Sequence, residues 1–289
     1  MAFATEQLLP YHLALPARRQ GCVVFSSPHS GADYPQQMLA VSPLSRLVLR
    51  SSEDAFVEQL LRAAPSLGAP LIAARFPRAW VDLNRGSDEL DPALIEGLRG
   101  QRLNPRVAAG LGVIPRVVAA GRAIYPGKIS RAEAQARIDA VWHPYHARLG
   151  TLLSEAHAAH GVAVLIDVHS MPHEVLASMP GRAPHIILGD RFGASSAPWV
   201  SASVEAAFAA EGLRVARNAP FAGAYIAQAH GRPRYGRHVV QVEIDRALYM
   251  DERRVEPSAD FEAFIALMTR VLARIVPLGR PDAVPLAAE

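Results

Sequence analysis

The sequence of 289 residues contains a single cysteine, Cys22, which excludes an intrachain disulfide and a zinc site built on cysteine thiolates. One cysteine is also in keeping with a reducing cytoplasm, the location we expect. Cys22 stands in an apolar run and is predicted to be an unreactive core residue. Any metal ligands must therefore be histidines and carboxylates, and 11 histidines are present.

Long apolar runs are also absent, because no stretch reaches the roughly 18 residues that a membrane-spanning helix needs. The segment 1–16 lacks a basic start and carries Glu6, so it does not resemble a signal peptide. We therefore expect no membrane partner. Hydrophobic residues nevertheless make up 50% of the chain, which is enough for a sizeable core and too much for general disorder.

Lysine is nearly missing, since Lys128 is the single lysine among 30 basic residues and the others are arginines. Against 27 acidic residues this leaves a formal net charge of +3. The arginines are spread among acids rather than gathered in blocks, so we expect no nucleic-acid partner. The sequence also lacks a GxxxxGK[ST] loop, a GxSxG elbow and a GxGxxG after its first strand, which disfavours phosphate-loop, serine-hydrolase and dinucleotide chemistry.

Short apolar runs alternate with helically spaced segments, which predicts an α/β fold with a mixed, mostly parallel central sheet flanked by helices. The expected strands are 21–27, 70–74, 80–83, 162–167, 185–188, 213–216 and 238–244. The expected helices are 54–64, 130–160 with a kink or break at Pro144, 197–211 and 258–276. We expect a single domain over 1–289, with an irregular insertion at 86–130 that could close over a site.

Polar clusters follow several predicted strands, where open α/β sheets bind their ligands. His29 and His169 each stand just past a strand, and two such imidazoles with a carboxylate would make a metal site with one position open for water. For either histidine alone a structural role is the commoner one. Asp167 is a candidate to orient a metal ligand or to cap a buried backbone group.

Charged residues in two other strand contexts suggest a base and an anion pocket. Glu243 lies in the apolar run VVQVEID, where it could act as a general base or pair with an arginine. Asn84 and Arg85 can hold a carboxylate, and Arg75 and Arg78 lie near them in the sequence. The alternative for these arginines is a solvated, ion-paired loop.

The chain resembles the N-formylglutamate amidohydrolase (N-formylglutamate deformylase) family, which is related to zinc carboxypeptidases and aspartoacylase. The resemblance lies in SPHSGADYP, SSEDAFVEQLL, GAPLIAARFPRAWVDLNR, HPYHARL, IDVHSMP and QVEIDRALYMDE, in the family's order between about residues 21 and 252. It implies a metal-dependent hydrolase of linear amide bonds that cleaves N-formyl-L-glutamate, or a similar small N-acyl acidic amino acid, in histidine degradation. It also implies a zinc carboxypeptidase-like fold with one Zn²⁺ per chain.

The resemblance further assigns roles to the polar residues. His29 and His169 would bind the zinc, and Glu243 would be the catalytic base. Asn84 and Arg85, helped by Arg78, would hold the substrate.

The third metal ligand departs from the related aspartoacylase pattern HxxE, because Ala32 stands where the acid would be. Asp54 is our first choice, with Asp33 and Glu53 as alternatives. In the segment AHGRP, His230 could donate to a substrate carboxylate or be a surface-loop histidine.

Two other functions stay open at this point. One is a related metal-dependent deacylase or carboxypeptidase-like hydrolase that acts on a different acyl amino acid. The other is a non-catalytic protein that binds an acidic ligand through its arginines.

Overall fold

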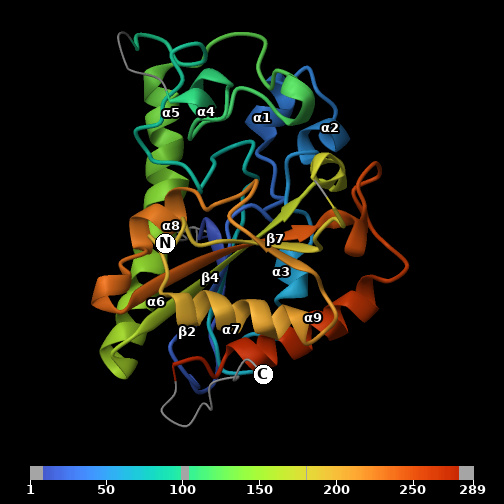
Figure 1. The fold of residues 1–289 in the computed structure, drawn as a ribbon. Helices are drawn as coiled ribbons and strands as arrows, with labels where there is room; N and C mark the ends of the chain where they lie inside the picture. The colour runs from blue at the N-terminus through green and yellow to red at the C-terminus, as the bar shows by residue number, and fades with distance from the viewer. Residues whose placement is uncertain (1–8, 99–103, 180, 280–289) are drawn as a thin grey trace, which may run out of the picture.

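The computed structural model describes residues 9–98, 104–179 and 181–279. Within these residues, seven strands form one sheet in the order β1-β3-β2-β4-β7-β5-β6 (Figure 1). They are β1 (Tyr11–Ala14), β2 (Val23–Ser27), β3 (Leu71–Ala74), β4 (Ala163–Met171), β5 (Ile186–Gly189), β6 (Val215–Arg217) and β7 (Arg237–Asp245). The pairs β1–β3 and β5–β7 are antiparallel and the other pairs are parallel, which confirms the predicted mixed, mostly parallel sheet.

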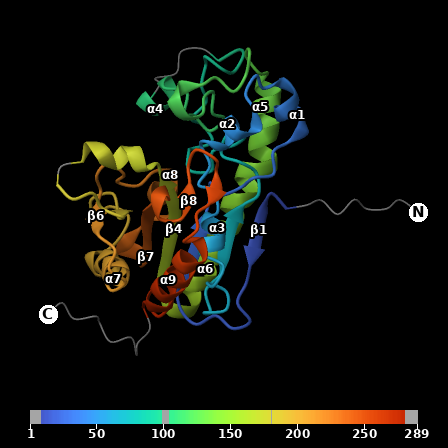
Figure 2. The same cartoon turned by 90° about the vertical axis from the view of Figure 1, so that its right-hand side faces the viewer.

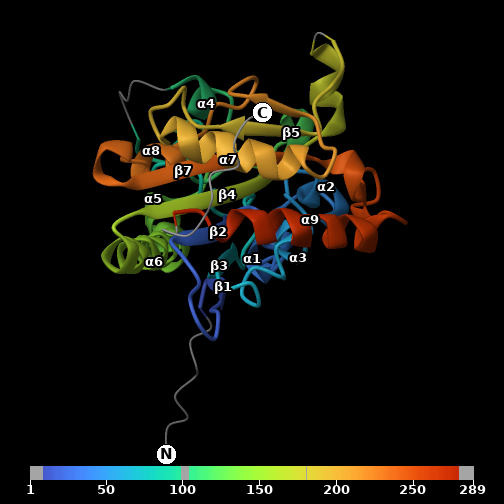
Figure 3. The ribbon, with the colours of Figure 1, turned by 60° about the horizontal axis from the view of Figure 1, so that its bottom comes forward.

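Helices cover both faces of this sheet, as Figures 2 and 3 show. The helices are α1 (Gln36–Val41), α2 (Arg46–Arg50), α3 (Val57–Leu60), α4 (Pro105–Ala108), α5 (Arg131–Arg137), α6 (His143–His160), α7 (Pro198–Ala209), α8 (Tyr225–His230) and α9 (Phe261–Ile275). A separate small hairpin joins β8 (Met250–Asp251) to β9 (Glu256–Pro257). In the part of the chain that the structure describes, no helix combines the length and the apolar character needed to cross a membrane.

The central strands are apolar on both faces because each face packs on a different helical layer. In β2, Val23 and Phe25 belong to the core under α3, α7 and α9, whereas Val24 belongs to the core under α6. The same alternation holds in β4, where Val164 faces the first core and Leu165 the second. Burial on both sides explains why these strands read as unbroken apolar runs.

The predicted long helix is present, with a change of geometry before its proline. Ser130 caps α5 through a hydrogen bond from Glu133 N, 3.1 Å long, and Gly161 ends α6 with φ 70°. Between α5 and α6 a π-helical turn spans Ile138–Trp142, so Pro144 falls in the first turn of α6. Arg137 and His143, at the two ends of the π turn, keep right-handed helical angles, so the helical path continues from α5 into α6 and does not break at Pro144.

Two of the expected elements are wrong. Residues 80–83 form a turn rather than a strand, because Trp80 N bonds back to Pro77 O and Asp82 N bonds to Val113 O. The expected helix 54–64 shortens to α3, since Phe56 takes a left-handed φ of 67° before it and turns follow it. The apolar side chains of both segments are buried, apart from half-buried ones such as Phe56, but burial alone does not specify the backbone.

The described parts of the segment 86–130, residues 86–98 and 104–130, are largely irregular, but they are packed onto the core. They carry α4 and bury Leu94, Ile95, Val113 and Ile114 in the core under α6. Figure 2 shows them above one end of the sheet, close to α1 and α2. The sequence reading missed α1, α2, α8 and the antiparallel edge strand β1.

Candidate active site

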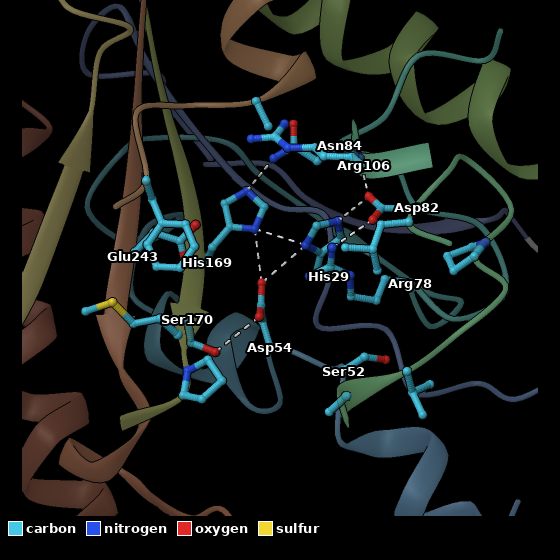
Figure 4. A pocket seen from close by; sticks show the side chains of 18 of the residues that line it. His29, Ser52, Asp54, Arg78, Asp82, Asn84, Arg106, His169, Ser170 and Glu243 are labelled. Atoms are coloured by element: carbon cyan, nitrogen blue, oxygen red, sulfur yellow. Dashed lines mark hydrogen bonds and ion pairs between the residues drawn. The ribbon is translucent and has the colours of Figure 1, made fainter. Parts of the chain in front are cut away.

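The site lies where parallel strands β2, β4 and β7 end side by side. His29 follows β2 by two residues, and His169 and Glu243 are directly paired in the register of β4 and β7. His169 therefore lies inside a strand, not just past it as the sequence suggested. A cavity of about 520 Å³ opens at this end of the sheet and is lined by all three residues together with Asp54 (Figure 4).

His29, Asp54 and His169 point toward one another in this cavity (Figure 4). His169 Nδ1 lies 3.1 Å from His29 Nδ1 and 3.0 Å from Asp54 Oδ2, and His29 Nδ1 lies 3.4 Å from the same oxygen. The loop before α3 brings Asp54 here, held by a 3.0 Å hydrogen bond from Asp54 N to His29 O. All three side chains are buried.

The outer nitrogen of each ring faces a buried carboxylate. His29 Nε2 donates to Asp82 Oδ1 at 2.7 Å, and His169 Nε2 lies 3.1 Å from Asp167 Oδ2. With the protons placed on the outer nitrogens, both inner Nδ1 atoms present lone pairs to the same point. Carboxylates commonly orient metal-binding histidines in this way.

The other carboxylate oxygen of Asp54, Oδ1, accepts hydrogen bonds from Ser170 and Arg246. Ser170 Oγ donates to Asp54 Oδ1 at 3.2 Å, and Arg246 Nη2 donates to the same oxygen at 3.2 Å. Arg246 also donates to Ser170 Oγ, at 3.0 Å, and to the Glu53 carbonyl, at 2.6 Å. These bonds leave Oδ2 directed at the two histidines.

The charges of the site depend on these contacts. When a proton rather than a cation lies between the inner nitrogens and Asp54, the histidines donate to that carboxylate instead of presenting lone pairs. Burial alone would raise the pKa of Asp54, but hydrogen bonds from His169 and His29 hold that pKa well below its usual range. Burial alone would lower the pKa of His169, but Asp167 and Asp54 hold it well above its ordinary value. Burial likewise works against Asp82, whose pKa stays well below normal because of Arg78 and His29.

The donor set fits a divalent cation. Two imidazole nitrogens and one carboxylate oxygen lie within 4.8 Å of one another, and all three residues are buried. Ligands at 2.0–2.2 Å from a tetrahedral zinc would lie roughly 3.3–3.6 Å apart, close to the observed separations. Two nitrogen lone pairs and a carboxylate directed at one buried point repel one another unless a positive charge lies between them.

The two alternative acids lie elsewhere. Asp33 is half exposed and pairs with Arg75, 2.7 Å away, so Arg75 also lies outside the cavity lining. Glu53 is buried, but its oxygens accept hydrogen bonds from Tyr34 (2.6 Å) and Arg50 (3.0 Å). Asp54 is therefore the acid that the structure brings to the histidines.

Glu243 lines the cavity from β7 and is held by a neighbour two residues earlier in the strand. Gln241 Nε2 donates to Glu243 Oε1 at 2.8 Å. Burial raises the pKa of Glu243 to about 7, against the opposing influence of His169. A carboxyl group with a pKa near neutrality can both accept and return a proton.

The predicted substrate-holding residues also line the cavity. Arg78 Nη2 donates to Asp82 Oδ2 at 2.7 Å. Arg85 is anchored by Nε to Leu111 O (2.9 Å) and by Nη1 to Asn84 O (2.9 Å). Asn84 accepts from Ile226 N at 2.8 Å and places its Nδ2 3.2 Å from His169 Nε2.

Other cavity walls come from two further segments. Residues 86–130 contribute a further guanidinium, Arg106, and the stretch 117–121. Residues 221–224, before α8, also line the cavity. His230, at the end of α8, does not line the cavity but stacks on His146, with ring centroids 5.8 Å apart.

Three residues that support the site were not singled out from the sequence. Arg246 and Gln241 flank Glu243, and polar residues at alternate positions 241, 243 and 245 were a signal that β7 turns one polar face to the cavity. The third residue is Asp82, which stands two residues before Asn84. Its contact with His29 joins residues 53 positions apart, which no local pattern reveals.

Comparison with known proteins gives one consistent family. Residues 21–250 match the family described as N-formylglutamate amidohydrolase. The chain is 36% identical over 224 residues to the N-formylglutamate deformylase of Pseudomonas aeruginosa, covering 76% of this chain and 78% of that one. It is 30% identical over 202 residues to the enzyme of the same name from Pseudomonas putida, covering 69% and 71%.

A solved structure agrees. The crystal structure of N-formylglutamate amidohydrolase from Ralstonia eutropha superimposes with a TM-score of 0.87 at 34% identity. The match covers 93% of this chain and 98% of that one. The resemblance carried by the sequence motifs is thus confirmed.

Proposed function

This chain belongs to the N-formylglutamate amidohydrolase family, and we propose that it hydrolyses N-formyl-L-glutamate to formate and glutamate with one zinc ion per chain. The observation that carries the proposal is the convergence of His29, Asp54 and His169 beside Glu243. This cluster lies in a cavity that also holds arginines. The proposed metal ligands are these two histidines and Asp54.

A divalent cation at these ligands would lower the pKa of a water molecule and polarise the formyl oxygen. The protein's part is to hold the ligand atoms in place before the substrate arrives. Asp82 fixes His29, Asp167 fixes His169, and Arg246 fixes Asp54. Because a neighbouring side chain fixes each ligand, the ligand atoms need to move little during the reaction.

Glu243 is the proposed general base. It takes a proton from the attacking water and later gives it to the departing amine nitrogen. Its burial supports this role, because a poorly solvated carboxylate with a raised pKa accepts protons readily at neutral pH, and Gln241 holds it in place. Arg78, which reaches the same cavity, is placed to stabilise negative charge that develops on the formyl oxygen.

The substrate carries two carboxylates, and the cavity offers guanidinium groups to meet them. Arg85 is anchored through Nε and Nη1, which leaves its remaining amino group for a ligand. Asn84 sits between Arg85 and the metal ligands and is proposed to orient the substrate. A pocket that contains several guanidinium groups favours an acidic acyl amino acid over a neutral one.

We also propose that residues 86–130 close over the bound substrate, within a single domain of residues 1–289. Support comes from the walls of the cavity, to which this segment contributes Arg106 and the stretch 117–121. A cover of this kind would exclude bulk water during hydrolysis.

The test is formate release and glutamate formation from a panel of purified substrates. N-formylglutamate, N-acetylglutamate, N-formiminoglutamate and N-formylglutamine are assayed side by side. The proposal predicts that N-formylglutamate has the highest kcat/KM and that N-formylglutamine, which lacks the side-chain carboxylate, is turned over far less well. Faster turnover of the acetyl or formimino compound would identify a different deacylase, and no turnover of any substrate would favour a binding protein.

A further inference from the structure

The motif HPYHARL lies on α6, outside the cavity, yet it touches the loop that carries the substrate-holding residues. We propose that Trp142 and His146 are positioning residues. They hydrogen-bond to the backbone on both sides of Asn84 and so orient Asn84 and Arg85 toward the cavity. The inference deepens the proposed function and rests on it, because it concerns how the same substrate is held.

The contact consists of two hydrogen bonds, from ring nitrogens of Trp142 and His146 to the backbone carbonyl groups on either side of Asn84. Trp142 Nε1 donates to Arg85 O at 2.8 Å, and His146 Nε2 donates to Leu83 O at 2.9 Å. Both donor side chains are buried, so water does not compete for these carbonyls. Asn84 is the residue between the two held carbonyls.

The tautomer of His146 follows from its partners. A carbonyl oxygen only accepts, so the proton of His146 must be on Nε2 and its Nδ1 is left to accept from His230 Nε2, 3.4 Å away. Burial lowers the pKa of His146 to about 3 and that of His230 to about 4. Both rings are therefore neutral at physiological pH, and His230 acts by fixing His146.

The backbone of the helix places both donors on one side. The π-helical turn ends at Trp142, and His146 follows one turn later, so the two rings pack together with centroids 4.1 Å apart and planes tilted by 37°. Tyr225 of α8 packs against both rings, at 5.6 Å and 5.4 Å. Figure 1 shows α8 beside α6, in agreement with these contacts.

The same loop is held from its other side. Ile226 N, at the start of α8, donates to Asn84 Oδ1, which turns Asn84 Nδ2 toward His169 and Gln241. Asn84 thus has its side chain fixed by α8 and its flanking carbonyls fixed by α6. A displacement of about 1 Å in such a loop is enough to lower the rate of a positioned reaction strongly.

The first arm of the test measures the loop without using activity. Hydrogen–deuterium exchange of peptides covering residues 80–90 is compared in the wild type, Trp142→Phe, His146→Leu and His146→Gln. Trp142→Phe and His146→Leu should speed exchange in these peptides, whereas glutamine can still donate from Nε2 and should restore slow exchange. Trp199→Phe is the matched control, because Trp199 is 46% exposed on α7 and its ring packs against His238. Unchanged exchange in Trp142→Phe and His146→Leu overturns the inference.

The second arm measures N-formylglutamate kinetics in a double-mutant cycle. Trp142→Phe should raise KM by about 5- to 30-fold, the effect of one lost buried hydrogen bond, with a smaller change in kcat. If Trp142 acts through Arg85, this effect should nearly vanish in the Arg85→Ala background. An equal effect of Trp142→Phe in both backgrounds, or a loss of thermal stability with unchanged KM, would mean that Trp142 serves only to pack the core. Either result overturns the inference. A wild-type protein that releases no formate overturns the proposed function instead. The hydrogen–deuterium exchange result alone then decides whether Trp142 and His146 hold the loop.

Discussion

The Nδ1 atoms of His29 and His169 lie 3.1 Å apart, while the outer nitrogen of each ring faces its own buried carboxylate. The two rings come from neighbouring parallel strands and are separated by 140 residues of sequence. Their arrangement makes sense when a cation shares the two lone pairs with Asp54. The first predictions follow from this relationship.

Asp54→Asn should remove most of the metal from the purified protein. An amide oxygen carries no negative charge, so it binds zinc far less well than the carboxylate does. Metal content per chain is measured by atomic emission after dialysis against metal-free buffer. Asp33→Asn is the matched control and should keep the wild-type content, because Asp33 is half exposed and pairs with Arg75. Full metal retention in Asp54→Asn, or its loss in Asp33→Asn, would refute this choice of ligand.

Glu243→Gln should retain the metal and the fold but lose about 10²- to 10⁴-fold in kcat, because the amide cannot take a proton from water. The substitution keeps the shape of the side chain and its place beside Gln241. Formate release and metal content are measured on the same preparation. A variant with full metal and near-normal kcat would show that another group is the base.

Arg85→Ala should raise KM for N-formylglutamate by about 10- to 100-fold while changing kcat less, as expected for a group that contributes uniform binding. Arg148→Ala serves as a control for loss of positive charge, since Arg148 lies on α6 and its guanidinium contacts Glu155. Thermal melting is recorded for both, because Arg85 also binds Leu111 O. Unchanged KM and kcat in Arg85→Ala would remove Arg85 from the substrate site.

Cys22 should be unreactive in the folded protein. Its side chain is buried, it donates to Leu278 O at 3.1 Å, and burial raises the pKa of the thiol to about 11. At pH 8 only about 0.1% of the thiol would be ionised, and the thiolate is the reactive form. Because the pKa is raised, labelling should speed up as the pH rises toward 11. A disulfide reagent should titrate one thiol per chain in denaturant and none in native buffer at pH 8, and rapid native labelling would contradict the account.

The sequence predicted the strands that are buried on both faces of the sheet. The doubly buried strands β2, β4 and β7 appear as apolar runs, and they lie where expected. The prediction of secondary structure failed where the buried apolar side chains belong to turns. Trp80 and Leu83 are buried, but the backbone between them is tied to Pro77 and Val113 instead of to a strand.

The site was predictable where chemistry follows a strand end, as at His29, His169 and Glu243. Asp54 was reached with the help of a family resemblance, because nothing local separates it from Glu53. Arg246 was out of reach, since its bond to Asp54 spans 192 residues. The hydrogen bonds of Trp142 and His146 to backbone carbonyls could not be predicted either. Any residue of the loop can supply a carbonyl group, so such bonds leave no pattern in its sequence.

The most direct test of the central claim is formate release from N-formylglutamate by the purified protein before and after removal of metal with a chelator. The account predicts activity in the untreated protein, its loss when about one zinc ion per chain is removed, and its return when zinc is added back. The protein should remain folded throughout by circular dichroism. Full activity in metal-free protein would contradict the account.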